Sequence, residues 1–252
     1  MVAATTVKII VGVAVGGLLL AVLILTCVLY VNSQKGTQAP RTRTRKVPPG
    51  MTRTVISDDP ILDSIEGFMS PEEADAIVAL VQGRFDRSVV VDDKTGAKAA
   101  DPSRTSSSVF LLRSENELIA AIEERAAALA GIPSTHLERL QVVRYSHGQF
   151  YKPHYDYLPL VGGDVATHGQ RSVTIFAYLN DLPADEPGGG TRFPELSVTV
   201  RPKKGAAALW HNMKPDGKTD PRTLHGGEEV AAPGTVKYGL NIWFRTRSQA
   251  HG

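Results

Sequence analysis

The residues most able to carry chemistry begin with a His-x-Asp pair, His154 and Asp156. On a β-strand, residues two positions apart point to the same face, so both side chains can reach one metal ion. The pattern alone is weak evidence, because a chain with 7 His residues often contains such a pair by chance. A third ligand elsewhere in the chain is therefore needed to support a metal site.

Three later histidines could supply that ligand: His168, His211 and His225. Two His and one carboxylate on one side of a metal are typical of non-haem Fe(II) oxygenases. His225 precedes a β-rich stretch with Lys237, and a lysine inside a barrel needs an anionic partner to keep its charge. A dicarboxylic cosubstrate would supply that anion, which favours His225 as ligand and Lys237 as anchor. A hydrogen-bonded structural histidine remains the alternative at each position.

Two helices are predicted upstream of this motif. The first begins at Ser70-Pro71-Glu72-Glu73, which combines an N-cap, a proline at the first helical position and a capping box, and it ends at Gly83. The second begins with a capping box formed by Ser114 and Glu117 and ends at Gly131. Both helices have apolar residues at helical spacing, so we expect them to pack on a sheet.

After Leu140 the sequence changes to short β-rich segments separated by Gly and Pro turns. These segments read LQVVRY, RSVTIFAYL, ALW and VKYGLNIWF. The pattern predicts a mainly β domain with flanking helices (α+β), built as a β-sandwich or jelly roll.

The N-terminal part has a different composition. Residues 9–31 form an uncharged apolar run that is long enough for a transmembrane helix, after a short tail, residues 1–8. The alternative, a cleaved signal peptide, usually has a shorter apolar core. The single Cys27 lies in this run, so no intramolecular disulfide is expected. Residues 32–55 are predicted to be a basic linker rich in Pro and Thr, followed by the folded domain at 56–248.

The charge distribution bears on partners and on membrane orientation. The formal net charge of +2 is too small to predict nucleic acid as a partner. Most basic residues near the apolar run follow it, so the positive-inside rule would place the folded domain in the cytosol. These residues are Lys35, Arg41, Arg43, Arg45, Lys46 and Arg53, against Lys8 before the run.

From about Ile61 to Arg245 the chain resembles the prolyl 4-hydroxylases, in particular the short membrane-anchored enzymes of plants, algae and viruses. The resemblance also extends to the catalytic part of the animal collagen enzyme. Several motifs in one order carry it, which is more specific than any motif alone. They are Arg104-Thr105-Ser106-Ser107, LQVVRYSHGQFYKPHYDY, RSVTIFAYLND, GGGTRFPEL, Pro202-Lys203-Lys204-Gly205, ALWHN, TLHGG and VKYGLNIW. The resemblance implies a double-stranded β-helix (jelly roll) as the catalytic core.

The resemblance also implies site residues. Fe(II) would be held by His154, Asp156 and His225. Lys237 would bind the distal carboxylate of 2-oxoglutarate, in a pocket lined by Tyr145 and Thr174. Lys237 lies twelve residues after His225, whereas about ten are expected in the family, so a longer turn at Ala231-Ala232-Pro233-Gly234 must absorb the difference.

The implied reaction is the 4-hydroxylation of proline, coupled to decarboxylation of 2-oxoglutarate by O2 to give succinate and CO2, with L-ascorbate as reductant. A proline-rich polypeptide in polyproline II form would dock on aromatic surface. We assign substrate binding to Tyr155, Tyr157, Trp243 and Arg104, and we expect the loop 91–103 to close over the peptide as a lid or to be an ordinary hairpin.

Two other functions remain open at this point. The domain could be a related dioxygenase for another protein side chain, or a jelly-roll binding module without catalysis. The resemblance implies a single-pass protein of the endoplasmic reticulum or Golgi membrane with a lumenal domain, against the charge rule. The sequence leaves the oligomeric state open.

Overall fold

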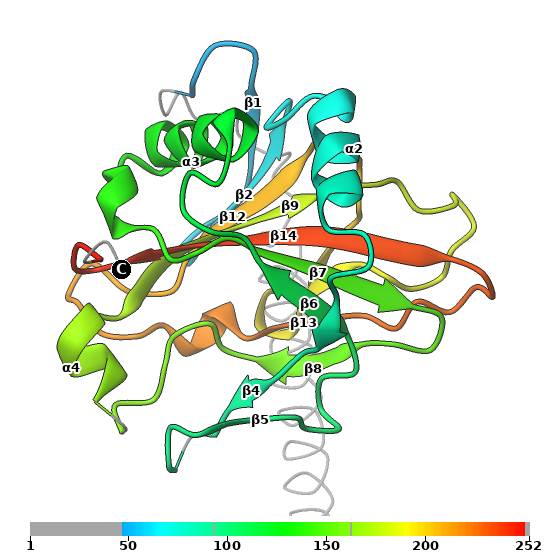
Figure 1. Cartoon of the computed structure of the whole chain (residues 1–252). Helices are drawn as coiled ribbons and strands as arrows, with labels where there is room; N and C mark the ends of the chain where they lie inside the picture. Colours follow the sequence, from blue (N-terminus) through cyan, green and yellow to red (C-terminus); the bar gives the residue numbers. More distant parts are fainter. Residues whose placement is uncertain (1–46, 93, 162, 250–252) are drawn as a thin grey trace, which may run out of the picture. The chain divides into compact units, whose positions relative to one another are not determined.

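The computed structural model describes residues 47–92, 94–161 and 163–249 (Figure 1). The predicted tail 1–8, the apolar run 9–31 and most of the linker 32–55 lie outside these residues. Within the described part of the chain, no helix combines the length and the apolar character needed to cross a membrane.

The domain is built mainly from antiparallel strands in two sheets, a large sheet of eight strands and a small sheet of four. The eight-stranded sheet has the order β1 (Thr52–Asp58), β2 (Ile61–Glu66), β12 (Ala207–His211), β9 (Arg171–Tyr178), β14 (Val236–Arg245), β7 (Gln141–Ser146), β6 (Ser107–Phe110) and β3 (Asp86–Arg87). The four-stranded sheet has the order β11 (Val198–Val200), β10 (Thr191–Phe193), β13 (His225–Gly227) and β8 (Tyr151–His154). A separate hairpin joins β4 (Val90–Val91) to β5 (Lys98–Ala99).

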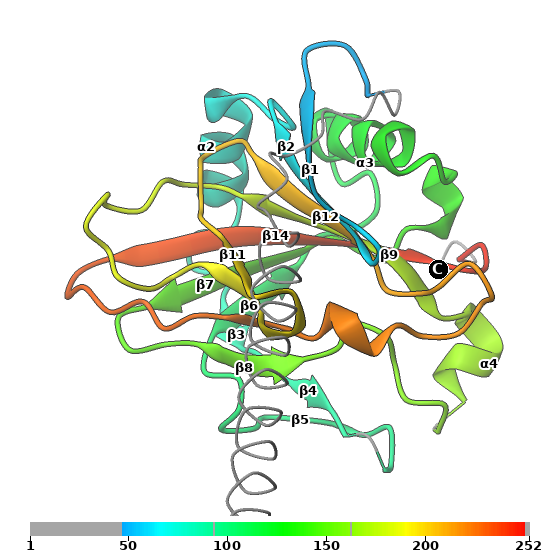
Figure 2. The ribbon, with the colours of Figure 1, turned by 180° about the vertical axis from the view of Figure 1, so that it is seen from behind.

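Helices lie on the side of the large sheet away from the small sheet (Figures 1 and 2). They are α2 (Pro71–Leu80) and α3 (Glu117–Ala130), while the short α4 (Asp164–His168) lies at the end of the sheet. Single 3-10 turns are η1 (Ser134–His136), η2 (Pro194–Leu196) and η3 (Pro221–Thr223). The arrangement confirms the predicted mainly β core with flanking helices and is consistent with a jelly roll.

Strand β9 shows how one strand serves two cores. Val173, Ile175 and Ala177 are buried in the cluster between the large sheet and the helices. Phe176 and Tyr178, which alternate with them, are buried in a second cluster between the two sheets. Alternation of side chains along a strand requires this division. The space between the sheets therefore receives every second residue of β9.

The capping box predicted at Ser70 is confirmed. The Ser70 hydroxyl accepts a hydrogen bond from the Glu73 amide at 3.2 Å, and the Glu73 carboxylate accepts from the Ser70 amide at 2.8 Å. The helix ends at Leu80 with Val81 as its C-cap, which is earlier than the predicted end at Gly83.

The capping box predicted at Ser114 and Glu117 is wrong. Asn116 is the N-cap of α3, and its side chain accepts from the Ile119 amide at 3.0 Å. Ser114 instead donates to the Glu123 carboxylate at 3.1 Å, a partner nine residues away, whereas a capping box joins residues three apart. Gly131, in the left-handed conformation at φ 68°, ends the helix as predicted.

The ordered domain begins before Ile56. Strand β1 starts at Thr52, within the segment expected to be a linker, and pairs with β2. Arg53 is buried and forms an ion pair with Asp63 at 3.4 Å, and it donates to the Leu129 carbonyl. Its basic character suggested a solvated tether, but a buried acidic partner on the next strand makes it part of the domain.

We predict that Glu73→Ala lowers the free energy of unfolding by about 1–2 kcal/mol, because Glu73 both caps α2 and binds Arg125 of α3. Both guanidinium nitrogens of Arg125 lie 2.7 Å from the Glu73 carboxylate. Urea denaturation at pH 7 measures the effect. The matched control is Glu72→Ala on the exposed side of the same turn, and equal losses in the two variants would contradict this assignment.

Candidate metal centre

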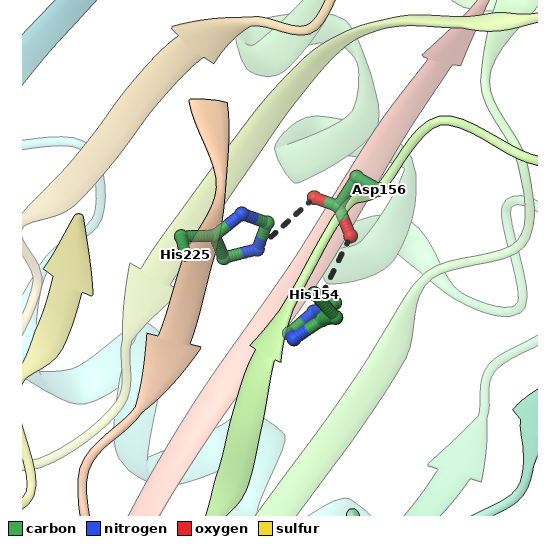
Figure 3. Close-up of side chains that lie close together, drawn as sticks. All are labelled: His154, Asp156 and His225. Atoms are coloured by element: carbon green, nitrogen blue, oxygen red, sulfur yellow. Dashed lines mark ion pairs between the residues drawn. The ribbon is translucent and has the colours of Figure 1, made fainter. Parts of the chain in front are cut away.

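Three possible ligands meet between the two sheets (Figure 3). His154 ends β8 and His225 begins β13, and the two residues lie opposite each other in the antiparallel pair. Asp156 follows two residues after β8. The nitrogen and oxygen ligand atoms of the three side chains all lie within 4.8 Å of one another. The structure thus brings together the His-x-Asp pair and one of the three candidate histidines.

Hydrogen bonds orient both imidazole rings. Nδ1 of His154 lies 2.9 Å from the Lys152 carbonyl, and Nδ1 of His225 lies 3.0 Å from the Thr223 carbonyl. A carbonyl oxygen only accepts, so each Nδ1 carries the proton and each Nε2 presents its lone pair. Both Nε2 atoms face Asp156, at 3.9 Å from Oδ1 for His154 and 3.6 Å from Oδ2 for His225.

The electrostatic environment favours the protonation states that bind a metal. Burial, together with the neighbouring His225, lowers the pKa of His154 to about 3, so this ring is neutral at physiological pH. Burial alone would raise the pKa of Asp156, but His225, His154, Arg171 and the Thr174 hydroxyl lower it. A neutral imidazole and an ionised carboxylate are the ligating forms. The donor set of two imidazoles and one carboxylate fits Fe(II).

Aromatic rings enclose the two histidines. Tyr151 stacks on His154 with ring centroids 3.5 Å apart. Trp210 and Phe193 lie against His225, at centroid distances of 4.6 and 5.6 Å. These contacts fix the ring planes and keep bulk water away from the ligand atoms.

Thr174 contacts a candidate metal ligand directly. Its hydroxyl donates to Asp156 Oδ2 at 2.7 Å, and the residue is fully buried on β9. Arg171, three residues earlier, reaches the Asp156 carbonyl at 3.5 Å. Its guanidinium also lies 3.7 Å from the centre of the Trp243 ring and forms an ion pair with Glu138. The side chain and the backbone of Asp156 are therefore both held by β9.

Lys237 lies in a separate aromatic cradle between the sheets. It is only 1% exposed, and its ammonium lies 5.4 to 5.8 Å from the ring centres of Tyr145, Phe176 and Tyr178. Among described residues it donates to the Gly190 carbonyl at 3.5 Å. Burial lowers the pKa of Lys237 to about 7, against a weaker opposing effect of Glu228. Such a site favours an anionic guest that restores the lysine's charge.

The longer turn before Lys237 has its own anchor. The buried carboxylate of Glu186 accepts hydrogen bonds from the backbone amides of Ala231 at 2.8 Å and Ala232 at 3.0 Å. The Gly189 amide donates to the Glu229 carbonyl at 2.8 Å beside them. The turn is thus tied to the loop that supplies Gly190, and Lys237 enters β14 directly opposite Tyr145.

The four residues assigned to substrate binding differ in their exposure to solvent and in their contacts. Tyr155 and Tyr157 stack on each other at 4.5 Å, and Tyr155 is 38% exposed. Trp243 is buried beneath Arg171. Arg104 is also buried, and its guanidinium donates to Ser106, to the Val89 carbonyl and to Gln141 while lying over the Tyr151 ring. These contacts give Arg104 a role in holding Tyr151, and a contact with substrate stays a prediction.

The other two candidate histidines lie away from the cluster. His168 is exposed on α4 and pairs with Asp164 at 3.2 Å. His211 follows Trp210 on β12, so it points to the opposite face of the sheet, where it lines an open cavity of about 540 Å³ with Ile61 and Met213. Sequence reasoning gave no site role to Tyr151, Phe193 or Arg171, because ring stacking and cation contacts across strands leave no local pattern.

Comparison with known proteins agrees with this geometry. Residues 140–245 match the family model of the 2OG-Fe(II) oxygenase superfamily. Prolyl 4-hydroxylase 1 of Arabidopsis thaliana is 37% identical over 209 residues, which cover 77% of this chain and 72% of the relative. Prolyl 4-hydroxylase 5 of the same plant is 37% identical over 209 residues, covering 75% and 70%.

Solved structures show the same fold. The viral collagen prolyl hydroxylase of Paramecium Bursaria Chlorella virus-1, in complex with 2OG, is 26% identical with a TM-score of 0.57, covering 74% of this chain and 96% of that one. A Pseudomonas putida prolyl-4-hydroxylase is similar in fold, at 19% identity and a TM-score of 0.52, covering 74% and 93%. The sustained identity to the plant enzymes shows that this chain belongs to the prolyl 4-hydroxylase family of 2-oxoglutarate- and Fe(II)-dependent dioxygenases.

Proposed function

We propose that this chain is a membrane-anchored peptidyl-proline 4-dioxygenase that acts on proline-rich polypeptides. The observation that carries the proposal is the convergence of the buried Asp156 and His225 and the partly buried His154 in one cluster, in the same inter-sheet space as the cradle of Lys237. When bound, Fe(II), 2-oxoglutarate and O2 supply the oxidising chemistry. L-ascorbate as a reductant belongs to the same proposal.

The chain's own residues bind the metal and the cosubstrate and orient them. His154, Asp156 and His225 hold the metal and leave its remaining positions to the cosubstrate and O2. Lys237 receives the distal carboxylate of 2-oxoglutarate, and Tyr145, whose ring centre lies 5.4 Å from the Lys237 ammonium, lines the same pocket. The aromatic walls exclude water, which strengthens both charge interactions.

The Tyr155–Tyr157 stack supplies the aromatic surface for the substrate. A polyproline II helix presents flat proline rings and free carbonyls, which dock on aromatic side chains. These two tyrosines flank Asp156, so a peptide on them lies next to the metal. The β4–β5 hairpin forms a two-stranded sheet of its own, and we propose that it closes over the bound peptide as a lid. Hydroxylation of another side chain is the second candidate, because the metal cluster alone does not select proline.

We also propose that residues 9–31 anchor the chain and that the catalytic domain faces the lumen of the endoplasmic reticulum or Golgi. The length of the apolar run supports the anchor. The resemblance to membrane-anchored prolyl 4-hydroxylases supports the lumenal side, whereas the basic residues after the run oppose it.

Incubation of the full-length chain with Fe(II), 2-oxoglutarate and a proline-rich peptide should add one oxygen atom to proline, detected by mass spectrometry. His154→Ala should lower turnover by about 100-fold or more, because it removes a metal ligand. The matched control is His168→Ala, an exposed histidine outside the cluster, which should retain full activity.

Three results would contradict this assignment in different ways. Oxygen added only to a residue other than proline would favour the second candidate. Absence of iron binding by the wild-type chain would favour a non-catalytic binding module. A fully active His154→Ala variant would refute the ligand assignment.

Lys237→Met should abolish binding of 2-oxoglutarate and yet stabilise the ligand-free protein. The folded-state pKa of Lys237 is lowered from 10.5 to about 7, so the unfolded chain binds more protons between these pH values. Burying this lysine therefore costs stability at and below pH 7, and the cost disappears as pH rises toward 10. At pH 7 the free energy of unfolding should rise by about 2–4 kcal/mol, since one pKa unit corresponds to about 1.4 kcal/mol.

Thermal and urea unfolding without cosubstrate, at several pH values, measures this change, and calorimetric titration measures the binding of 2-oxoglutarate. Lys203→Met removes an exposed lysine that pairs with Glu66 and is the control. A Lys237→Met protein that is less stable than wild type at pH 7 would show that the lysine already has a stabilising partner.

The membrane topology can be tested with sealed microsomes. We expect the catalytic domain of the full-length chain to resist added protease until detergent opens the vesicles. Complete digestion in sealed vesicles would place the domain on the cytosolic side, as the positive-inside rule predicts.

A further inference from the structure

Asn212 is a buried polar residue that ends the ALWHN motif but belongs to no metal-ligand pattern. It follows β12 and is fully buried. Its Nδ2 lies 2.9 Å from the hydroxyl of Thr174, and that hydroxyl lies 2.7 Å from Asp156 Oδ2. Three side chains from three distant parts of the sequence thus form a chain of hydrogen bonds that ends on a candidate metal ligand.

The hydrogen bonds that link Asn212, Thr174 and Asp156 allow only one arrangement of their protons. An ionised carboxylate only accepts, so the single hydroxyl proton of Thr174 must be donated to Asp156. The Thr174 oxygen then accepts, and its partner on residue 212 must be a donor. An asparagine amide provides that donor, whereas an aspartate in its ionised form would compete with Asp156 for the same proton.

Two hydrogen bonds hold the main chain of Asn212 in place. The backbone N–H of Asn212 donates to the Ser172 carbonyl at 2.8 Å, and the backbone carbonyl of Asn212 accepts from the backbone N–H of Asp220 at 2.9 Å. These bonds attach the residue both to β9, which carries Thr174, and to the segment before His225. Because the main chain of Asn212 is held on both sides, its side-chain amide reaches the Thr174 hydroxyl from a fixed position and can keep Thr174 in one rotamer.

We propose that Asn212 is a positioning residue that acts through Thr174 to fix the carboxylate of Asp156 for metal binding. The inference rests on the proposed function, in which the His154–Asp156–His225 cluster holds Fe(II). The hydroxyl donor on Oδ2 fixes the rotation of the carboxylate, whose Oδ1 is then presented to the metal. Binding through one oxygen keeps open the positions that the cosubstrate and O2 require.

Titration of the full-length chain with Mn(II), followed by electron paramagnetic resonance of the free ion, tests this inference without any turnover. Thr174→Val and Asn212→Leu should each weaken Mn(II) binding by about 10–100-fold, as expected for the loss of a hydrogen bond to a metal ligand. The double variant should bind no more weakly than the weaker single variant, because Asn212 acts through Thr174. Thr174→Ser retains the hydroxyl and should restore wild-type binding.

Ser172→Ala is the matched control. Its hydroxyl lies on the same strand and donates to the Phe244 carbonyl at 3.1 Å, away from the metal ligands, so its loss should leave Mn(II) affinity unchanged. The absorption spectrum of bound Co(II) provides a second readout, because it reports the geometry of the ligands. It should change in Asn212→Leu and remain unchanged in Ser172→Ala.

Wild-type Mn(II) affinity in Asn212→Leu, or losses in the two single variants that add fully in the double variant, would overturn the proposal. If Asn212→Leu does not give a native circular dichroism spectrum, Asn212→Ala introduces no larger group and is held to the same outcomes. A wild-type chain that binds no Mn(II) would overturn the proposed metal site together with this inference. Tight binding by wild type and variants alike would overturn this inference alone.

Discussion

The burial of charge between two β-sheets is the constraint on which the rest of this structure depends. Asp156 and Lys237 are both almost completely removed from solvent, in an interior built largely from aromatic and aliphatic side chains. An ionised group in such surroundings is costly unless a partner of opposite charge lies close by. Asp156 faces the imidazoles of His154 and His225, with Arg171 nearby, and Lys237 faces aromatic rings and a carbonyl. The interior can therefore bind two ligands, a cation at Asp156 and an anion at Lys237.

The fold supports this polar interior with an apolar layer that has no part in the chemistry. Along β9, the residues that face the helices are aliphatic and fully packed, while Thr174 on the other face holds Asp156. Stability from the helix side lets the inter-sheet side keep groups that do not themselves favour folding. Loop contacts complete the enclosure, because Glu186 ties the turn before Lys237 to the loop that carries Gly190.

Features that depend on local spacing could be predicted from the sequence, and features that depend on distant partners could not. The Ser70 capping box lies within four residues and forms as predicted. His154 and Asp156 converge as expected, but Asp156 lies in a bend two residues past β8 and not on the strand. The spacing of Ser114 and Glu117 predicts the wrong N-cap for α3, because Ser114 bonds to Glu123, beyond the reach of a local motif. Likewise, local composition predicts a linker at Arg53 because its partner Asp63 belongs to the next strand. The hydrogen bond from Asn212 to Thr174 also leaves no local pattern, because it depends on β12 lying beside β9.

The charges of the buried groups also explain why the two guests belong together. A divalent cation bound by ionised Asp156 and neutral histidines leaves one net positive charge, and protonated Lys237 adds another. A doubly charged dicarboxylate cosubstrate balances both, whereas either guest alone leaves uncompensated charge in a low-dielectric interior. Each guest therefore lowers the cost of admitting the other, and this coupling is reciprocal by thermodynamic necessity. The same balance accounts for the buried Lys237, whose pKa burial lowers to about 7: a dicarboxylate would offset a charge that is unfavourable in these surroundings.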